Sequence, residues 1–176
     1  IIMLNYKYEE ILEEKVLNNF TDKQRKEIGD LIIGQDYGFF IDVKKICKIL
    51  DIKIEEGKPL DNLDINESGK YIAETKTILF DPNEQEIKQR FIITHQLYRA
   101  IFGQKEESFK SQISEKYHDV ISKMYEINTN HFTFQLLMPV KLIKILMLKS
   151  INKHEYNSEC LNHRSLTLLL ERWQKS

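Results

Sequence analysis

The stretch Arg90-Phe-Ile-Ile-Thr-His-Gln-Leu-Tyr-Arg-Ala-Ile-Phe-Gly103 is the part of this sequence that most constrains its fold and its chemistry. Upstream, Asp81-Pro82 is typical of a helix start, since proline is tolerated in the first turn. We therefore expect a helix over 83–102 that ends at Gly103. Residues four apart share one face of a helix, so His95 and Arg99 should lie on the same face, with Gln96 beside the histidine.

A zinc peptidase of the zincin type carries His-Glu-x-x-His on one helix, where both histidines bind Zn²⁺ and the glutamate activates water. Here the pattern reads His95-Gln96-Leu97-Tyr98-Arg99. The amide of Gln96 cannot accept a proton at neutral pH, and the guanidinium of Arg99 stays protonated and only donates. A lone helical histidine is more often a surface or core residue than a ligand, so this motif alone indicates little.

A second run, from Glu126 to Pro139, reads Glu-Ile-Asn-Thr-Asn-His-Phe-Thr-Phe-Gln-Leu-Leu-Met-Pro. It resembles the second signature of the ImmA/IrrE family of metallopeptidases, Glu-x-x-Ala-Asn-x-Phe-Ala-Ala-x-Leu-Leu-Met-Pro. The resemblance places Glu126 at the position of the family's third zinc ligand. Thr129, Thr133 and Phe134 stand where the family usually has alanine.

Two further stretches extend the resemblance. Residues 41–54 are similar to the family's entry helix and first strand, and Arg90-Phe91 is similar to its lead-in to the first histidine. Together the matches cover 39–139. They imply an α+β fold, a helix-rich zincin-like domain with a small β-sheet.

The site itself departs from the family pattern. His95 and Glu126 remain as metal ligands, but Arg99 replaces the other histidine, Gln96 replaces the catalytic base, and Tyr98 stands where glycine is usual. The positive charge of a guanidinium opposes Zn²⁺ binding. We therefore expect no cofactor and no catalysis, with zinc as the cofactor only if the site proves functional.

The remaining sequence is consistent with a helix-rich chain, because it holds only 6 glycines and 3 prolines. The domain boundaries we predict are N-terminal helices over 1–38, the metallopeptidase-like core over 39–139, and C-terminal helices over 140–176 that pack on the core. Apolar spacing and turn residues predict helices over 6–19, 22–33 (ending at Gly34), 41–50, 114–137, 140–148 and 159–173, a polar linker over 104–112, and strands over 51–55 and on both sides of a turn at 74–76.

The overall composition excludes several classes of protein. The chain has 176 residues, with 26 Lys plus Arg against 27 Asp plus Glu, so the net charge is -1. Strong phosphate-backbone binding needs a basic surface, so we expect no direct nucleic-acid contact. No apolar run approaches the roughly 18 residues of a membrane span, and no signal-peptide pattern begins the sequence, so we expect a cytoplasmic protein. Cys47 and Cys160 are expected to be small buried residues.

Four other histidines are candidates for substitute ligands. His118 lies two turns before Glu126 and is expected near its face, whereas His131 should point elsewhere. His154 and His163 lie in the C-terminal part, where spacing indicates nothing. The aromatic residues of the two motif segments are expected to pack in the core, with a substrate groove as the alternative; they are Phe91, Tyr98, Phe102, Phe132 and Phe134.

Three functions remain open from the sequence. The first is a catalytically inactive ImmA/IrrE-like protein that binds or regulates another protein; the resemblance implies partners among helix-turn-helix repressors of prophages and mobile elements. The second is an active zinc peptidase, or another hydrolase, with a rearranged site. The third is a helical domain whose site is decaying. For the first, we expect Arg99 to replace the metal by pairing with Glu126 beside His95; the alternative is that both side chains are solvated.

Overall fold

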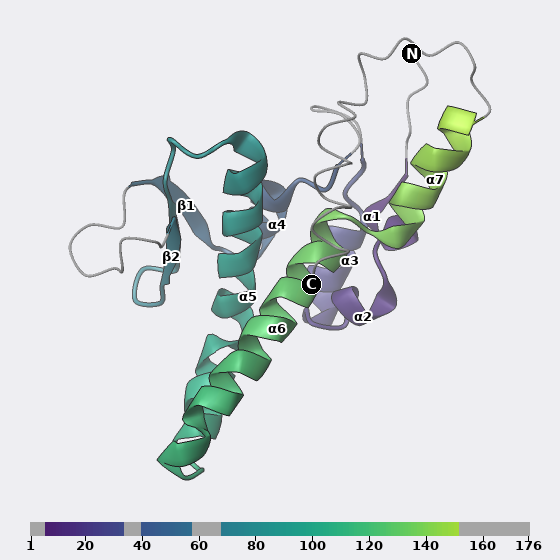
Figure 1. Cartoon of the computed structure of the whole chain (residues 1–176). Coiled ribbons are helices and arrows are strands. Elements are labelled where there is room, and N and C mark those ends of the chain that lie inside the picture. The colour runs from purple at the N-terminus through teal and green to yellow at the C-terminus, as the bar shows by residue number, and fades with distance from the viewer. Residues whose placement is uncertain (1–5, 34–39, 58–67, 152–176) are drawn as a thin grey trace. The chain divides into compact units, whose positions relative to one another are not determined.

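The computed structural model describes residues 6–33, 40–57 and 68–151, and its elements are arranged as shown in Figure 1. The chain forms a helix-rich α+β fold with one three-stranded sheet, which confirms the predicted fold class. Residues up to Leu142 form one compact unit, and a second unit begins at Ile143. Among the described residues, no helix is long and apolar enough to cross a bilayer.

The N-terminal segment forms two short helices instead of the single helix predicted over 6–19. They are α1, Tyr8–Ile11, and α2, Glu14–Leu17, and the backbone between them is extended at Leu12. In one continuous helix, Leu17 would lie about 180° from Tyr8 at 100° per residue. The break allows both side chains to be buried together with Leu12.

The third helix, α3, spans Asp22–Gly29. The predicted capping box is present, because Thr21 and Gln24 satisfy each other's backbone N–H groups. The helix ends four residues before the predicted end at Ile33, since the backbone after it pairs with the N-terminal segment through a bridge between Lys7 and Ile32. Gly34, the predicted end residue, lies outside the described residues.

The middle of the chain follows the predicted order. Helix α4, Val43–Ile49, is capped by Asp42, whose carboxylate accepts from the backbone of Lys44 and Lys45. Three strands follow, β1 (Lys53–Glu56), β2 (Gly69–Ile72) and β3 (Thr77–Phe80). Strand β3 is central, parallel to β1 and antiparallel to β2, so β1 and β2 are the two edges of the sheet.

Two long helices complete the compact unit. Helix α5 spans Glu86–Lys110, and α6 spans His118–Leu137 after a 3-10 turn at Glu115–Tyr117. The prediction that a helix ends at Gly103 and a linker follows is therefore wrong. A glycine inside a helix costs only about 1 kcal/mol, and here the next turns are supported by an ion pair between Glu106 and Lys110 at 2.7 Å.

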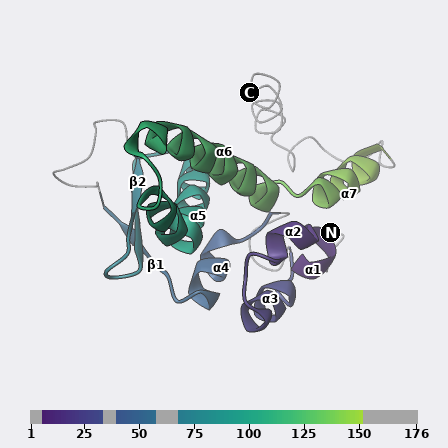
Figure 2. The same ribbon diagram turned by 90° about the horizontal axis from the view of Figure 1, so that it is seen from below.

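Helix α5 lies between the sheet and α6, and both views in Figures 1 and 2 show this order. Its buried residues Ile92, Ile93 and Leu97 form the centre of the core. On α6, the buried face includes Thr129 and Thr133, whose hydroxyls donate to carbonyls one turn earlier on the same helix. These threonines are therefore satisfied where the family-like pattern has alanine.

Arg90 and Tyr8 attach other segments to this core. Arg90 donates to the carbonyl of Ile41 at 3.0 Å and lies 4.0 Å from the centre of the Phe40 ring. The hydroxyl of Tyr8 accepts from the backbone N–H of Asp42 at 2.7 Å. The start of α4 is therefore held by α5 on one side and by α1 on the other.

Helix α6 ends at Leu137, as predicted, and buried Pro139 follows. Helix α7 spans Val140–Ile151 and agrees with the helix predicted over 140–148. Within α7, Leu142 is buried and belongs to the compact unit. The predicted last helix over 159–173, with Cys160, lies outside the described residues.

The close contact between Gly69 of β2 and Ile92 of α5 predicts that a larger residue at position 69 destabilises the fold. A Cβ on Gly69 would lie 2.2 Å from Cγ2 of Ile92 and 2.9 Å from the backbone oxygen of Leu79. We expect Gly69→Ala to lower the free energy of unfolding by about 1–3 kcal/mol through overpacking. Gly103→Ala is the matched control, because no atom lies within 4 Å of its Cβ position. It should raise stability by about 0.5–1 kcal/mol. Urea denaturation measures both, and a neutral Gly69→Ala would contradict the close approach.

Candidate functional site

The two helices bring the predicted site residues together. His95 and Arg99 lie one turn apart on α5, and Glu126 faces them from α6. His95 Nε2 is 3.0 Å from one carboxylate oxygen of Glu126, and Arg99 Nη2 is 3.2 Å from the other. Since an ionised carboxylate only accepts, both nitrogens donate to it. The predicted ion pair between Arg99 and Glu126 is therefore present, with His95 beside it.

The two carboxylate oxygens of Glu126 have different partners. Arg99 contributes one nitrogen to one oxygen, and His95 contacts the other. The side chains of Arg99 and Glu126 are 51% and 47% exposed, while that of His95 is 14% exposed. The pair is therefore open to solvent on one side, which limits its contribution to stability.

The electrostatics of the site favour the ionised form of Glu126. Partial burial of this carboxyl would raise its pKa, but the hydrogen bond from His95 and the charges of His95 and Arg99 act in the opposite direction and outweigh it. The pKa of Glu126 is consequently lowered from its ordinary value. The pKa of Glu126 is therefore lower in the folded state than in the unfolded state, where it is about 4.3. The ionised carboxylate stabilises the fold above that pH, and this stabilisation is lost as the pH falls through the pKa of the folded state.

Gln96 has a structural contact where a zinc peptidase would have its base. Its side-chain oxygen accepts from the backbone N–H of Tyr71, at 3.1 Å, on the edge strand β2. Together with the contact between Gly69 and Ile92, this bond attaches α5 to the sheet. Sequence reasoning missed Gly69 and Tyr71. The available signal was a glycine at the start of a strand, which indicates a close backbone approach.

Of the five aromatic side chains predicted to pack in the core, Phe132 is buried and the other four are half-buried, with contacts between α5 and α6. Phe91 lies 6.0 Å from the ring of His95 and 5.8 Å from that of Phe134, measured between ring centres. Tyr98 contacts Phe132 at 5.4 Å and Phe102 at 4.5 Å. These contacts bury one side of the imidazole and fix the spacing of the two helices at the site.

The alternative histidines do not join the site. His118 lies 3.0 Å from the carbonyl of Lys110, at the turn between the long helices, and not at Glu126 as the sequence suggested. His131 contacts Gln135 on the exposed side of α6, in agreement with the prediction that it points elsewhere. His154 and His163 lie outside the described residues.

Cys47 is buried, as predicted, and this burial raises the pKa of its thiol to about 12.

These side chains do not fit a resident zinc ion. A protein zinc site uses three or four N, O or S donors, whereas His95 and Glu126 supply two and Arg99 adds a positive charge at the third position. Within the described ranges, no three His, Cys, Asp or Glu side chains are grouped so that they could hold a metal. The chemistry of the donor set therefore opposes zinc at this place.

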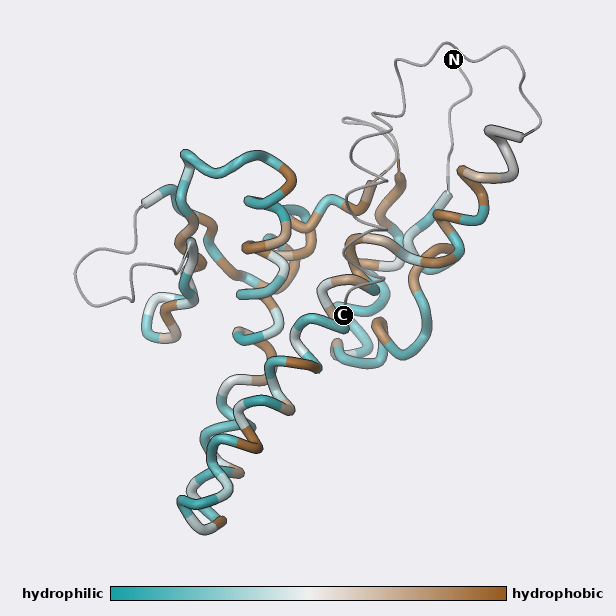
Figure 3. The backbone as a smooth tube through the Cα atoms, in the orientation of Figure 1, coloured by the Kyte–Doolittle hydropathy of each residue, from teal (hydrophilic) through white to brown (hydrophobic). Residues whose placement is uncertain are grey.

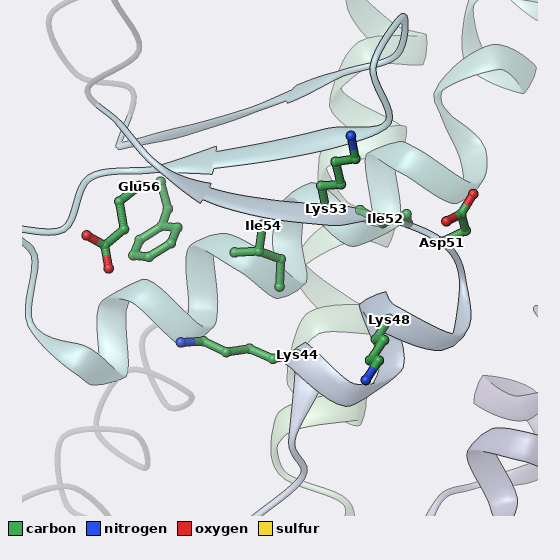
Figure 4. A pocket seen from close by; sticks show the side chains of 8 residues that line it. Lys44, Lys48, Asp51, Ile52, Lys53, Ile54 and Glu56 are labelled. Atoms are coloured by element: carbon green, nitrogen blue, oxygen red, sulfur yellow. The ribbon is translucent and has the colours of Figure 1, made fainter.

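Two hollows are open on the surface of the compact unit. One, of about 450 Å³, lies beside the ion pair and is lined by both long helices, including Arg99, Lys123 and Glu126. The other lies between α4 and β1 (Figure 4). In that second hollow, the ammonium groups of Lys44, Lys48 and Lys53 point in different directions, so they do not converge on a common ligand.

Comparisons with known proteins add no family to this geometry. The sequence matches no protein-family model and no curated protein. The resemblance described above therefore depends on the motif residues alone, and the function it implies is a proposal.

The lowered pKa of Glu126 generates a test of the ion pair. We expect Arg99→Met to raise the pKa of Glu126, measured by NMR titration of its side-chain carboxyl, because a positive charge is removed while the burial remains. Arg25→Met is the control, since Arg25 pairs with Glu14 in the N-terminal helices. Because the Arg99 pair is half-exposed, the variant should lose less than about 1 kcal/mol of stability. An unchanged pKa in Arg99→Met would show that the pair does not form in solution.

Proposed function

We propose that this chain is a non-catalytic relative of the ImmA/IrrE metallopeptidases and acts as a protein-binding or regulatory module. The observation that carries the proposal is the group formed by His95, Arg99 and Glu126. In the motifs that the chain resembles, these three positions hold zinc. Here a guanidinium pairs with the carboxylate instead.

The spacing of the two remaining donors supports the relationship to a metal site. Two ligands bound at about 2.0–2.1 Å to a tetrahedral zinc lie roughly 3.3 Å apart. His95 Nε2 and Glu126 Oε1 are 3.0 Å apart, although they come from different helices. Two side chains of types that bind zinc are thus adjacent, at a distance that is also that of an ordinary hydrogen bond.

The side chains of Gln96 and Arg99 support loss of catalysis. A general base contributes about 10²–10⁴-fold to rate, and the amide of Gln96 cannot take that role. Its oxygen also accepts a backbone hydrogen bond from Tyr71. The active-peptidase alternative would need Arg99 to leave the site and another donor to enter, and His118 and His131 are occupied elsewhere.

The proposed partner follows from the resemblance alone. Active members of the family act on helix-turn-helix repressors of prophages and mobile elements, and a version without catalysis would bind such a protein without cutting it. We propose the same setting here, in the cytoplasm and without direct contact to nucleic acid. The half-exposed site and the hollow beside it are accessible to a protein partner, which supports this proposal.

A zinc titration tests whether Arg99 is what excludes the metal. We expect the unmodified chain to bind Zn²⁺ at this site no more tightly than Arg99→Ala, since both have only two donors. Arg99→His should bind Zn²⁺ at least tenfold more tightly than either, because it supplies a third donor. Isothermal calorimetry at neutral pH measures the three affinities. Tight binding by the unmodified chain, lost in His95→Ala, would overturn the proposal.

A peptidase assay tests the loss of the base separately. Gln96→Glu alone should remain inactive on a helix-turn-helix repressor incubated with zinc, because Arg99 still occupies a ligand position. Gln96→Glu combined with Arg99→His is the informative comparison, since it restores both groups. Zinc-dependent cleavage by the unmodified chain would contradict the proposed function.

A further inference from the structure

The outer face of α6 carries a row of exposed apolar side chains. Val120, Met124 and Ile127 are 55%, 55% and 67% exposed, and Tyr117 before them is 51% exposed. Hydrophobic positions recur along this helix in Figure 3. The spacing between successive members is three, four and three residues, which is the spacing of the seam in a coiled coil. We call Tyr117, Val120, Met124 and Ile127 the α6 stripe.

Within the part of the chain that the structure describes, the α6 stripe lies away from the buried face of α6. The buried face of α6 is centred on Thr129 and Leu136. At about 100° per residue, Val120 and Ile127 lie roughly 160–180° away from Thr129 around the helix axis. Single apolar residues scattered on a surface need no explanation, whereas a contiguous group of exposed apolar residues is typical of interaction sites.

Lysines border one side of the stripe. Lys123 lies about 120° from Thr129 around the axis of α6, and Lys116 lies seven residues earlier, in the 3-10 turn before the helix. Both are exposed, and in the described part of the chain neither forms an ion pair with a carboxylate. Lys116 instead lies 4.8 Å from the ring centre of Tyr117. The border of the stripe is therefore positively charged and available to an acidic partner.

We propose that the α6 stripe binds an amphipathic helix of another protein, whose apolar face is bordered by Asp or Glu. Such a helix would place its own seam residues against Val120, Met124 and Ile127 and its carboxylates against the two lysines. This identifies the surface and the partner chemistry for the binding role proposed above. It rests on that role, but not on the exclusion of zinc.

The positive charge of Lys123 also favours an acidic partner helix over a second copy of the chain. In an antiparallel pair of helices, positions on the same side of the seam face each other. Two copies of α6 paired about their stripes would therefore bring Lys123 close to Lys123 of the other copy, where like charges repel. An acidic helix turns the same positions into attractive pairs.

The test uses the full chain and a synthetic helical peptide of about three heptads, with leucine at the seam and glutamate on both borders. Glutamate on both borders keeps the peptide monomeric at neutral pH. We expect binding, measured by fluorescence anisotropy of the labelled peptide, to weaken at least tenfold in Ile127→Glu and several-fold in Lys123→Glu. It should also weaken as salt is added. Ile87→Glu is the matched control, since Ile87 is 48% exposed on α5, outside the stripe, and should leave binding unchanged.

Four results would overturn the proposal. They are no binding by the unmodified chain, equal binding of a peptide with lysine borders, equal loss in Ile87→Glu and Ile127→Glu, and self-association of the unmodified chain that Ile127→Glu abolishes. The last would assign the stripe to a second copy. Circular dichroism of each variant ensures that the fold is retained. Peptide binding by a chain that also proved to be a zinc peptidase would refute the proposed function and leave this surface intact.

Discussion

The contact between α5 and the edge strand β2 positions the helix that carries His95 and Arg99. Gly69 leaves room for Ile92 to lie against the strand, and Gln96 accepts the outward N–H of Tyr71 one turn later. Once α5 is held in this way, His95 and Arg99, which lie one turn apart and about 20–60° around the helix from Ile92, are within reach of Glu126 on α6. The aromatic contacts of Phe91 and Tyr98 then set the distance at which Glu126 meets them.

In this chain Arg99 places a positive charge beside the α6 carboxylate that faces the histidine on α5. The substitution changes the character of the site. A zinc ion would be bound by lone pairs and would leave a position open for substrate, whereas a guanidinium only donates and reacts with nothing. The half-exposed pair contributes modestly to stability, so its main consequence is chemical: the site that we propose to be related to a metal site holds a neutralised, solvent-facing ion pair.

The sequence predicted those parts of the structure that local chemistry determines. Asp42 and the Thr21–Gln24 box mark true helix starts, the turn before Thr77 separates two strands, and the helical spacing of His95 and Arg99 places them on one face. It failed where tertiary contacts overrule local signals. Gly103 does not end α5, because the neighbouring helix and an ion pair support the following turns, and α1 breaks from α2 so that Leu17 can be buried. The role of Gln96 was also out of reach, because its partner Tyr71 is 25 residues away in sequence.

The two sides of α6 have different proposed roles. Glu126 lies next to the face that packs on α5, and the α6 stripe lies on the outer face. On the packed side, we propose that an arginine holds the place of a metal. The decisive measurement is the zinc content of the 176-residue chain, expressed in zinc-supplemented medium, purified without chelators and analysed by mass spectrometry. We predict far less than one zinc per chain. One zinc per chain that is retained on dialysis and lost in both His95→Ala and Glu126→Ala would contradict it.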